Sequence, residues 1–493
     1  MPTRIEGSWV VGFDGTEHVL LRDGAVLIED DTIVWMGHRD DRPSDGPVIG
    51  GRGRLVIPGF INAHVHASSQ ASERMIADSG RPDLYNTGFL NYMPHKGRPG
   101  ESSGILVDPE RPDVGGVYTV VNLLRSGCTT MVEMGGELGG VGQIDGFVDV
   151  CDRLGMRAYL SPGYSAGTWY YDNDNRLKLS WDEAAGIAGL QRAIKFTEDH
   201  HGSSNGRIRG MLFPLEVATS TPRLLAETIQ AADRLNVGIS IHAGEAQLEW
   251  HRIVTEYGLT PVRFLARCGL LRPGVILGHC VFIDQHSATT FVDRRDLQLL
   301  AESGVAVAHC PLVFARRGFA LESFDRYRLA GVTMALGTDV FPQDMLFEMK
   351  VASLVAKVVD RSFSAGHARD LFNAATLGGA RALGRTDLGR LAPGALADVA
   401  VVNLRARHIG SVRDPISALV HSAIWSDVEH VLVDGRVVVS PNGVAGVDET
   451  DLTDRVQSTG EAIWRQFDQY RWDGKTLDEV AQHSFRTVDA LPN

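Results

Sequence analysis

The chain has 493 residues, of which 44% are hydrophobic and 22% are charged. These fractions are typical of folded globular proteins and exclude an intrinsically disordered chain. A formal net charge of −13 at pH 7 argues against a nucleic-acid-binding surface and favours a small neutral or cationic substrate. Because no apolar run is long enough to span a membrane and no signal-peptide pattern opens the sequence, we expect a cytoplasmic protein without a membrane partner.

Both ends of the chain contain short strand-like segments that are separated by turn dipeptides. Asp14-Gly15 and Asp23-Gly24 separate such segments near the start, and Asp434-Gly435 separates two of them near the other end. Asp-Gly favours the positive φ angles of a tight hairpin turn. We therefore predict small antiparallel sheets in residues 1–57 and 393–445.

The stretch from Val56 to His66 is a mostly apolar run that includes two histidines at its end, His64 and His66. The run predicts a buried strand. In an extended strand, alternate side chains point to the same face, and these two would lie about 7 Å apart along the chain. Two imidazoles in this arrangement can bind one metal ion.

Between residues 58 and 392, eight strand-like segments alternate with helix-like segments, which is typical of a parallel (β/α)8 barrel. After the first strand, the expected strands are 128–133, 157–160, 208–216 and four that end at His242, His279, His309 and Asp339. The carboxyl ends of barrel strands converge on one face. We therefore expect polar residues at these ends to surround a metal ion, and imidazoles with a carboxylate suit Zn2+, Fe2+ or Mn2+.

Two helix starts are predicted from local sequence. Ser180-Trp181-Asp182-Glu183 matches a capping box, in which a serine and a glutamate satisfy the first turn of a helix. Thr221-Pro222 places a capping threonine before a proline, which is favourable at the first helical position. Both helices would belong to the barrel.

Five motifs together resemble the amidohydrolase superfamily, and within it the branch of cytosine deaminase, guanine deaminase and the triazine hydrolases. The motifs are Pro58-Gly59-Phe60-Ile61-Asn62-Ala63-His64-Val65-His66, His242-Ala243-Gly244-Glu245, Gly278-His279-Cys280, His309-Cys310-Pro311 and Gly337-Thr338-Asp339. The resemblance implies an α/β fold, with a TIM-like (β/α)8 barrel over residues 58–392 and a lid insertion around 67–112. Residues 1–57 and 393–445 would join into a small discontinuous β-sandwich domain. Residues 446–493 would be a helical tail, and the protein would be a homo-oligomer, a dimer by this resemblance.

The resemblance also implies roles for the polar residues at the strand ends. One divalent metal ion, Zn2+ in preference to Fe2+ or Mn2+, would be held by His64, His66, His242 and Asp339. His279 would be either a further ligand or the group that stabilises the developing charge. Asp339 would also accept a proton from the metal-activated water, and Glu245 would carry a proton to the substrate ring and the leaving amine.

Four further residues are candidates for substrate contacts. Glu216, at the end of the fourth strand, would contact the substrate or bridge two metal ions, and His309 would contact the substrate or be a structural histidine. Many relatives have Ser-Asn after the His-x-Pro of this strand, whereas here Pro311 is followed by Leu312-Val313-Phe314. We therefore expect contacts unlike those of an adenosine-like substrate, and Phe314 would make one of them. Tyr92 lies in the lid, which would cover the substrate or form an oligomer contact.

The predicted function is a hydrolysis in which a metal-activated water displaces an amino or substituted-amino group from a nitrogen heterocycle. The heterocycle would be a small molecule of purine, pyrimidine or s-triazine type. Hydrolytic dechlorination of a triazine and cleavage of an amide, urea or carbamate C–N bond are alternatives. A non-catalytic scaffold with this fold is a remote alternative, because such a protein is expected to lack metal ligands, and here they are all present.

Overall fold

The computed structural model describes residues 2–42, 46–67, 92–93, 96–99, 104–105, 108, 110–111, 113–135 and 141–488. Most of the lid predicted for residues 67–112 lies outside the described residues. Within it, β6 (Tyr92–Met93) pairs with β7 (Gly104–Ile105) in a short antiparallel ladder. The covering role of the lid therefore stays a prediction.

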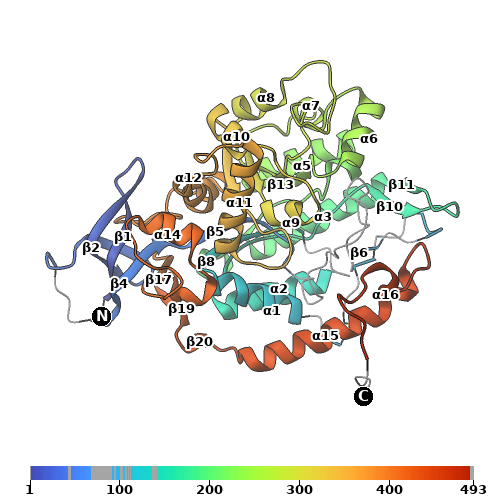
Figure 1. Ribbon diagram of the computed structural model, residues 1–493. Helices are drawn as coiled ribbons and strands as arrows, with labels where there is room; N and C mark the ends of the chain where they lie inside the picture. The colour runs from blue at the N-terminus through green and yellow to red at the C-terminus, as the bar shows by residue number, and fades with distance from the viewer. Residues whose placement is uncertain are drawn as a thin grey trace.

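Eight parallel strands form a closed barrel, which confirms the predicted fold class (Figure 1). They are β5 (Phe60–Val65), β8 (Cys128–Glu133), β9 (Arg157–Leu160), β12 (Ile208–Gly210), β13 (Ile239–Ala243), β14 (Val275–His279), β15 (Ala306–His309) and β16 (Thr333–Leu336). The first four and the last four each pair as one sheet. Bridges from Leu212 to Ile239 and from Glu216 to His242 join the sheets on one side, and a bridge from Val65 to Asp339 joins them on the other.

Helices surround the barrel and connect its strands (Figure 1). Those between the barrel strands and shortly after them are α1 (Val114–Arg125), α2 (Val141–Leu154), α3 (Glu183–His200), α4 (Ser203–Gly206), α5 (Pro222–Leu235), α6 (Gln247–Tyr257), α7 (Pro261–Arg267), α8 (Asp296–Ser303), α9 (Pro311–Arg316), α10 (Phe324–Ala330), α11 (Met345–Asp360), α12 (Ala368–Asn373) and α13 (Gly379–Ala382). Thr221 caps α5 by accepting the backbone N–H of Leu224 at 3.1 Å, as predicted. Leucines and alanines on the inner face of α5 are buried, so the helix packs on the barrel through this face.

The capping box predicted at Ser180 is wrong. Asp182 is the residue that caps α3, because its carboxylate accepts the backbone N–H of Ala185 at 2.9 Å. Ser180 and Trp181 belong instead to β11 (Leu177–Trp181), which pairs with β10 (Gly167–Tyr171) as a hairpin outside the barrel. The extended backbone of this hairpin delays the helix start by two residues.

A separate mixed sheet of eight strands contains both ends of the chain. Figure 1 shows the blue N-terminal strands beside the orange C-terminal ones. The order across the sheet is β20 (Gly443–Val444), β19 (Arg436–Ser440), β18 (Val428–Val433), β17 (Val399–Asn403), β4 (Val48–Pro58), β1 (Thr3–Phe13), β2 (His18–Glu29) and β3 (Thr32–His38). Strands β4 and β17 join the two ends of the chain, with Val56 opposite Val401. The expected boundaries at residues 57, 393 and 445 stay predictions.

Two of the three predicted Asp-Gly hairpin turns occur. Asp434-Gly435 links β18 to β19 with positive φ at both residues, and Asp14-Gly15 lies between β1 and β2. The turn predicted at Asp23-Gly24 is wrong, because these residues lie inside β2, which pairs continuously with β1 and β3. The turn comes later, at Asp30, which has φ of 54°.

The mixed sheet is attached to the barrel through a buried ion cluster. Arg157 of β9 is 1% exposed and donates two hydrogen bonds of 3.1 Å to Asp398. It also pairs with Asp434 of the β18–β19 turn, which Arg207 contacts in addition. Because these charges are buried and mutually satisfied, they fix the sheet against the barrel in one orientation.

The α-helices described after β17 are α14 (Pro415–His421), α15 (Glu449–Tyr470) and α16 (Leu477–Val480). The long α15 runs along α1, where Ile463 and Phe467 bury their side chains against Val114. The segment predicted to be a helical tail therefore packs on the first barrel helix (Figure 1). No helix in the described part of the chain combines the length and apolar character that crossing a membrane requires.

Candidate metal centre

Four buried side chains at the carboxyl ends of barrel strands converge on one point. One donor atom each from His64, His242, His279 and Asp339 lies within 4.8 Å of all the others. His66 lies beside them, with its Nε2 atom 3.1 Å from Nε2 of His242 and 3.3 Å from Oδ1 of Asp339. The structure therefore brings together all five residues predicted to lie at the metal.

Backbone pairing between β5 and the end of β16 sets the spacing of this cluster. The backbone N–H of Asp339 donates to the carbonyl of His64 at 2.9 Å, and that of His66 donates to the carbonyl of Asp339 at 2.8 Å. The Asn62 side chain strengthens the junction, because its Oδ1 accepts from the backbone N–H groups of His64 and Thr338, each at 3.2 Å. Its Nδ2 donates to the Thr338 hydroxyl at 2.8 Å. The barrel therefore closes at the site itself.

Glycines make room for His64. A Cβ atom on Gly278 would come within 2.6 Å of the His64 ring carbon Cε1, and one on Gly337 would come within 2.7 Å of the His64 carbonyl oxygen. Both distances are far below van der Waals contact. Gly278 is therefore required by the packing of the His64 ring, and Gly337 by the close approach of the His64 backbone.

The backbone leaves regular strand geometry where the side chains turn toward the cluster. His279 has φ of 83° and Asp339 has φ of 60°, which non-glycine residues seldom adopt. Such conformations cost of order 1–3 kcal/mol and persist where the surrounding structure enforces them, often at functional sites. Here they occur at the last residue of β14 and three residues after β16, where both side chains join the cluster.

The imidazoles of His64, His66 and His279 are held in the neutral form, which is the form that binds a metal ion. Burial lowers the pKa of His66 to about 3 and holds the pKa values of His64 and His279 well below their ordinary range. Within the described part of the chain, both ring nitrogens of His64 and of His279 lack hydrogen-bond partners. His242 donates through Nδ1 to the Leu215 carbonyl at 2.6 Å, which directs its Nε2 to the cluster. Buried, unpaired imidazole nitrogens beside a carboxylate fit a divalent cation such as Zn2+.

Glu245 is buried just beyond β13, after Gly244 with φ of 61°. Burial is the largest cause that raises the pKa of Glu245, and nearby charges of His242 and Arg317 oppose it. Arg317 donates to Glu245 Oε1 at 3.2 Å. Glu245 can therefore exchange a proton at the edge of the cluster while remaining fixed in position.

Two residues that hold Glu245 were not predicted. Glu249 of α6 accepts the backbone N–H groups of Gly244 and Glu245, at 2.8 and 3.1 Å. Arg317 lies just beyond α9, next to Arg316, and its guanidinium also covers the Phe314 ring at 5.3 Å. Glu249 could have been found from its place in the first helical turn after the His242 motif. No local pattern in the sequence indicated the role of Arg317.

The predicted substrate-contact residues occupy different surroundings. Glu216 lies beside His242 and accepts a hydrogen bond from Trp169 Nε1 at 3.2 Å. Phe314 packs edge-on against the His279 ring, with centroids 4.8 Å apart. His309 is buried, its ring lies 6.0 Å from that of Phe324, and burial lowers its pKa to about 3. The side chain of Tyr92 lies outside the described part of the structure, and all four roles stay predictions.

Comparisons with known proteins agree with the barrel fold and with the cluster of histidines and aspartate at its mouth. A sequence model of the amidohydrolase family matches residues 55–438, more than half of the chain. The chain belongs to the amidohydrolase family. The predicted resemblance is thus confirmed, as is the prediction of a deaminase-like amidohydrolase that acts on carbon–nitrogen bonds.

Amidohydrolases similar to this chain over nearly their whole length include two deaminases. A 5-methylthioadenosine/S-adenosylhomocysteine deaminase from Pelotomaculum thermopropionicum is 29% identical over 460 residues, which cover 92% of this chain and 96% of the relative. A 5'-deoxyadenosine deaminase from Methanothermobacter thermautotrophicus is 31% identical over 435 residues, which cover 87% of this chain and 92% of the relative.

Solved structures share the architecture. An adenosine deaminase from Xanthomonas campestris with bound zinc has a TM-score of 0.78 and 23% identity, and the match covers 94% of this chain and 98% of that one. A triazine hydrolase from Arthrobacter aurescens has a TM-score of 0.76 and 24% identity, with 94% and 99% covered. At these identities the neighbours establish the barrel fold alone.

Proposed function

We propose that this amidohydrolase removes an amino group by hydrolysis from a purine-type heterocycle, with one divalent metal ion bound at the cluster. The observation that carries the proposal is the placement of buried Glu245 beside four convergent donor atoms. A deaminase needs a proton donor for the leaving amine in addition to an activated water. Glu245 supplies this donor, and the named similarity to two adenosine-type deaminases supports the choice of a purine ring.

The ligands in this proposal are His64, His66, His242 and Asp339, and zinc is the proposed metal. A bound Zn2+ ion lowers the pKa of a water molecule from 15.7 to about 7 and so makes it nucleophilic at neutral pH. The unpaired nitrogens of His64 support this assignment, since a buried imidazole without a partner is otherwise costly. His279 presents the same unpaired nitrogens, so it remains either a further ligand or the group that stabilises developing negative charge.

The chain's own residues then move the protons. Asp339 accepts a proton from the attacking water, whose oxygen forms the new bond to the ring carbon that carries the amine. Glu245 delivers its proton to the adjacent ring nitrogen, then takes the proton of the new hydroxyl group and passes it to the amine. The C–N bond breaks, ammonia leaves, and the proton held by Asp339 passes back to Glu245. Arg317 keeps the Glu245 carboxyl oriented during these transfers, through its 3.2 Å hydrogen bond.

The substrate ring is proposed to lie against Glu216 and Phe314. The Glu216 carboxylate sits next to His242 and can accept N–H groups from a heterocycle, while Phe314 presents an apolar surface beside His279. The residues after Pro311 are Leu312-Val313-Phe314, and not the Ser-Asn that the family resemblance leads us to expect there. We therefore keep the proposal that contacts beyond the purine ring differ from those made to adenosine.

The test is a panel of heterocycles assayed for ammonia release by the zinc-loaded protein. The panel contains adenosine, 5'-deoxyadenosine, 5-methylthioadenosine, adenine, guanine, cytosine and an amino-substituted triazine. We expect turnover of at least one purine compound, and a loss of about 10²- to 10⁴-fold in the Glu245→Gln variant with metal content unchanged. Chloride release from a chlorotriazine, or hydrolysis of an aryl urea, without any ammonia release from the panel would overturn the proposal.

A further inference from the structure

The chain that follows α15 contacts the β10–β11 hairpin. Trp472 stacks on Tyr171 of β10, with ring centroids 3.9 Å apart and planes inclined by 12°. Figure 1 shows the red end of the chain close to this hairpin. The match to the amidohydrolase family ends at residue 438. The contact is therefore made by a part of the chain that the family match does not include.

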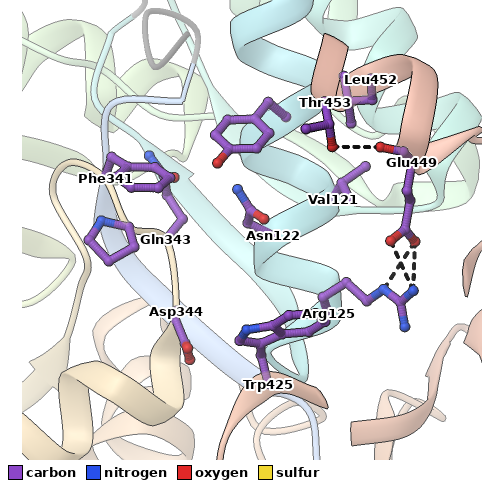
Figure 2. Close-up of a pocket in the computed structure, with 12 residues that line it drawn as sticks. Val121, Asn122, Arg125, Phe341, Gln343, Asp344, Trp425, Glu449, Leu452 and Thr453 are labelled. Carbon is purple, nitrogen blue, oxygen red and sulfur yellow. Dashed lines mark hydrogen bonds and ion pairs between the residues drawn. The ribbon is translucent and has the colours of Figure 1, made fainter. Parts of the chain in front are cut away.

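Trp472 is firmly supported, because α15 is attached to the barrel helix α1 near both of its ends. At the start of α15, Arg125 of α1 donates two hydrogen bonds to Glu449, at 3.0 and 2.9 Å (Figure 2). Near the other end, the fully buried Phe467 packs against Val114 of α1. The helix therefore cannot shift along α1 without breaking contacts at both ends.

The turn that carries Trp472 is held by contacts on both sides of this residue. Arg471 donates to Asp473 at 2.9 and 3.3 Å, and its guanidinium lies 5.7 Å from the centroid of the Trp472 ring. Further along, the backbone N–H of Leu477 in α16 donates to Asp468 of α15 at 2.9 Å. The Trp472 ring is therefore fixed by its own segment of the chain.

Strand β10 presents two aromatic side chains on one face. Trp169 and Tyr171 are two positions apart in an extended strand, so they point the same way, about 7 Å apart along the chain. Both are 5% exposed. Trp169 donates through Nε1 to Oε2 of Glu216 at 3.2 Å. One face of β10 therefore contacts Trp472 at one position and a proposed substrate-contact residue at the other.

The hairpin depends on such contacts for its position. Its turn, at residues 173–176, is exposed, and β11 is only partly buried. A two-stranded hairpin by itself is marginally stable in water. At the outer end of β10, the Tyr171 carbonyl accepts the backbone N–H of Gly97 at 2.7 Å, and the Tyr171 ring stacks on Trp472. Loss of the stack would therefore let this end of β10 shift, and Trp169 with it.

We propose that Trp472 is a positioning residue for the substrate. By stacking on Tyr171 it holds β10, so that Trp169 keeps the Glu216 carboxylate directed toward the heterocycle. The inference rests on the proposed function, in which Glu216 accepts N–H groups of the substrate. Because Trp472 acts through Glu216 and not through the metal ligands or Glu245, it contributes to substrate binding and leaves the chemical step unchanged.

The first test compares the steady-state kinetics of the zinc-loaded, full-length parent and its Trp472→Leu variant on a heterocycle that the parent deaminates. We expect KM to rise about 3- to 10-fold, the range that stacking of two aromatic rings contributes, with kcat within about twofold of the parent. Trp472→Phe keeps a stacking ring and should restore KM to within about twofold. An unchanged KM in Trp472→Leu, or a kcat that falls as much as KM rises, would overturn the inference.

A double-mutant cycle tests the route through Trp169. Trp169→Phe removes the N–H group that Glu216 accepts, so we expect its KM to rise as well. Adding Trp472→Leu to Trp169→Phe should raise KM by less than about twofold more, because the bond on which Trp472 acts is already lost. Full additivity of the two changes would show that Trp472 does not act through Trp169, and the inference would then be wrong.

A measurement without turnover keeps this inference separate from the proposed function. In protein that contains isotopically labelled tryptophan, the NMR signal of the Trp169 indole N–H is identified by its loss in Trp169→Phe. We expect Trp472→Leu to speed the exchange of this hydrogen with solvent about 3- to 10-fold, because the bond to Glu216 opens more often. Absence of turnover in the parent would count against the proposed function alone, whereas unchanged hydrogen exchange in Trp472→Leu would overturn this inference.

Trp425→Leu is the matched control. Trp425 is half exposed, and its ring centroid lies 5.9 Å from the Arg125 guanidinium, much as Trp472 lies near Arg471 (Figure 2). It belongs to the short 3-10 helix that precedes β18 of the mixed sheet. Unchanged KM and hydrogen exchange in Trp425→Leu, together with the changes expected in Trp472→Leu, support the inference. Equal changes in the two variants would show a general effect of losing a tryptophan and would overturn it.

Discussion

Glu249 accepts the backbone N–H of Glu245 at 3.1 Å, so one buried glutamate holds the other in place. A second bond, from the Gly244 N–H at 2.8 Å, fixes the turn between them. Burial raises the pKa of Glu249 to about 8, although the two N–H groups oppose this shift. The carboxyl group is therefore protonated in the folded protein at neutral pH.

This proton makes stability depend on pH. An unfolded glutamate releases its proton near pH 4.5, whereas folded Glu249 keeps it up to about pH 8. The folded state binds more protons across this window, so stability falls as pH rises, by at most about 1.4 kcal/mol per unit. We expect Glu249→Gln to flatten the profile of urea-unfolding free energy between about pH 5 and pH 8. Parallel profiles for the two proteins would contradict the assignment.

The packing of His64 against Gly278 predicts that a single methyl group disrupts metal binding. In Gly278→Ala, the new Cβ would meet the His64 ring at 2.6 Å and displace it. We expect metal affinity to fall by about 10- to 100-fold, the range seen when groups that orient metal ligands are changed. Elemental analysis after dialysis measures the loss.

Gly146→Ala is the control for this change. Gly146 is exposed on α2, and a Cβ there meets nothing within 4 Å. We expect full metal content and a stability gain of about 0.5–1 kcal/mol, because alanine favours a helix more than glycine does. Metal retention by both variants would show that the His64 ring can shift without consequence.

Variants of Glu216 and Asp339 test whether the site binds one metal ion or two. We expect about one metal equivalent per chain in the parent protein and in Glu216→Gln, with a changed substrate affinity or rate in the variant. Asp339→Ala should abolish turnover, since it removes a proposed ligand and the proposed acceptor of the water's proton. Two equivalents in the parent, reduced in Glu216→Gln, would instead indicate that Glu216 bridges two ions and would favour amide or urea cleavage.

The buried cluster around Arg157 predicts a large stability loss when its cation is removed. Arg157→Met would leave Asp398 buried without its cation and Asp434 with Arg207 alone, and the loss of a partner from a buried ion pair costs about 3–5 kcal/mol. Lys195→Met is the contrasting change, because Lys195 and Asp199 form an exposed pair that contributes about 0.5 kcal/mol or less. Urea unfolding measures the loss of stability in both variants. Equal losses would contradict the expected difference between the buried and the exposed pair.

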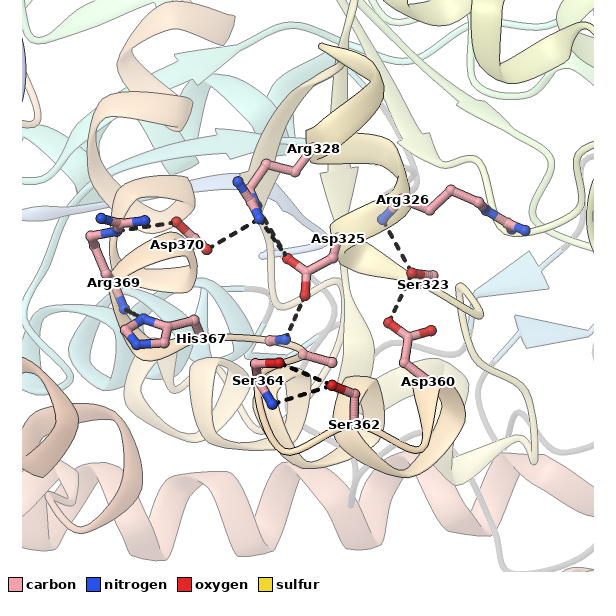
Figure 3. A network of polar contacts seen from close by, with 12 residues as sticks. Ser323, Asp325, Arg326, Arg328, Asp360, Ser362, Ser364, His367, Arg369 and Asp370 are labelled. Atoms are coloured by element: carbon pink, nitrogen blue, oxygen red, sulfur yellow. Dashed lines mark hydrogen bonds and ion pairs between the residues drawn. The ribbon is translucent and has the colours of Figure 1, made fainter.

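The partly exposed hydrogen-bond network around Asp325 should contribute less to the free energy of unfolding than the buried cluster around Arg157. Asp325 of α10 accepts from Arg328 at 3.1 Å and from the backbone N–H of Gly366 at 2.9 Å, so it ties α10 to the loop after α11 (Figure 3). We expect Asp325→Ala to lower the free energy of unfolding by about 1–2 kcal/mol. Asp325→Asn keeps an acceptor for Gly366 and should lose about half as much. Equal losses in the two variants would show that the backbone bond contributes nothing.

Much of the barrel could be predicted because its signals are local. The second and third strands, Cys128–Glu133 and Arg157–Leu160, begin and end at the predicted residues. Each carries an apolar run that needs no distant partner to be recognised. The metal cluster could be predicted from the same signals. The carboxyl ends of parallel barrel strands lie on one face, and the sequence places polar residues at those ends.

The errors occurred where pairing overrode a local motif. Ser180 had a capping sequence, but the β10–β11 hairpin kept it extended. Asp23 preceded a glycine, yet β2 has partners on both sides and runs through the dipeptide. Arg317 reaches Glu245 across 72 positions of sequence, and no local pattern reports such a contact.

The position of β4 between β1 and β17 imposes an order on synthesis. One edge of β4 pairs with β1, which is made earlier, but the other edge waits for Val399–Asn403, which the ribosome adds only after the whole barrel. Until then an apolar strand edge lacks its partner, and open edges of this kind recruit other chains. The emerging polypeptide is consequently most vulnerable to aggregation before its last hundred or so residues appear, and a chain that stops short of residue 399 keeps that edge open.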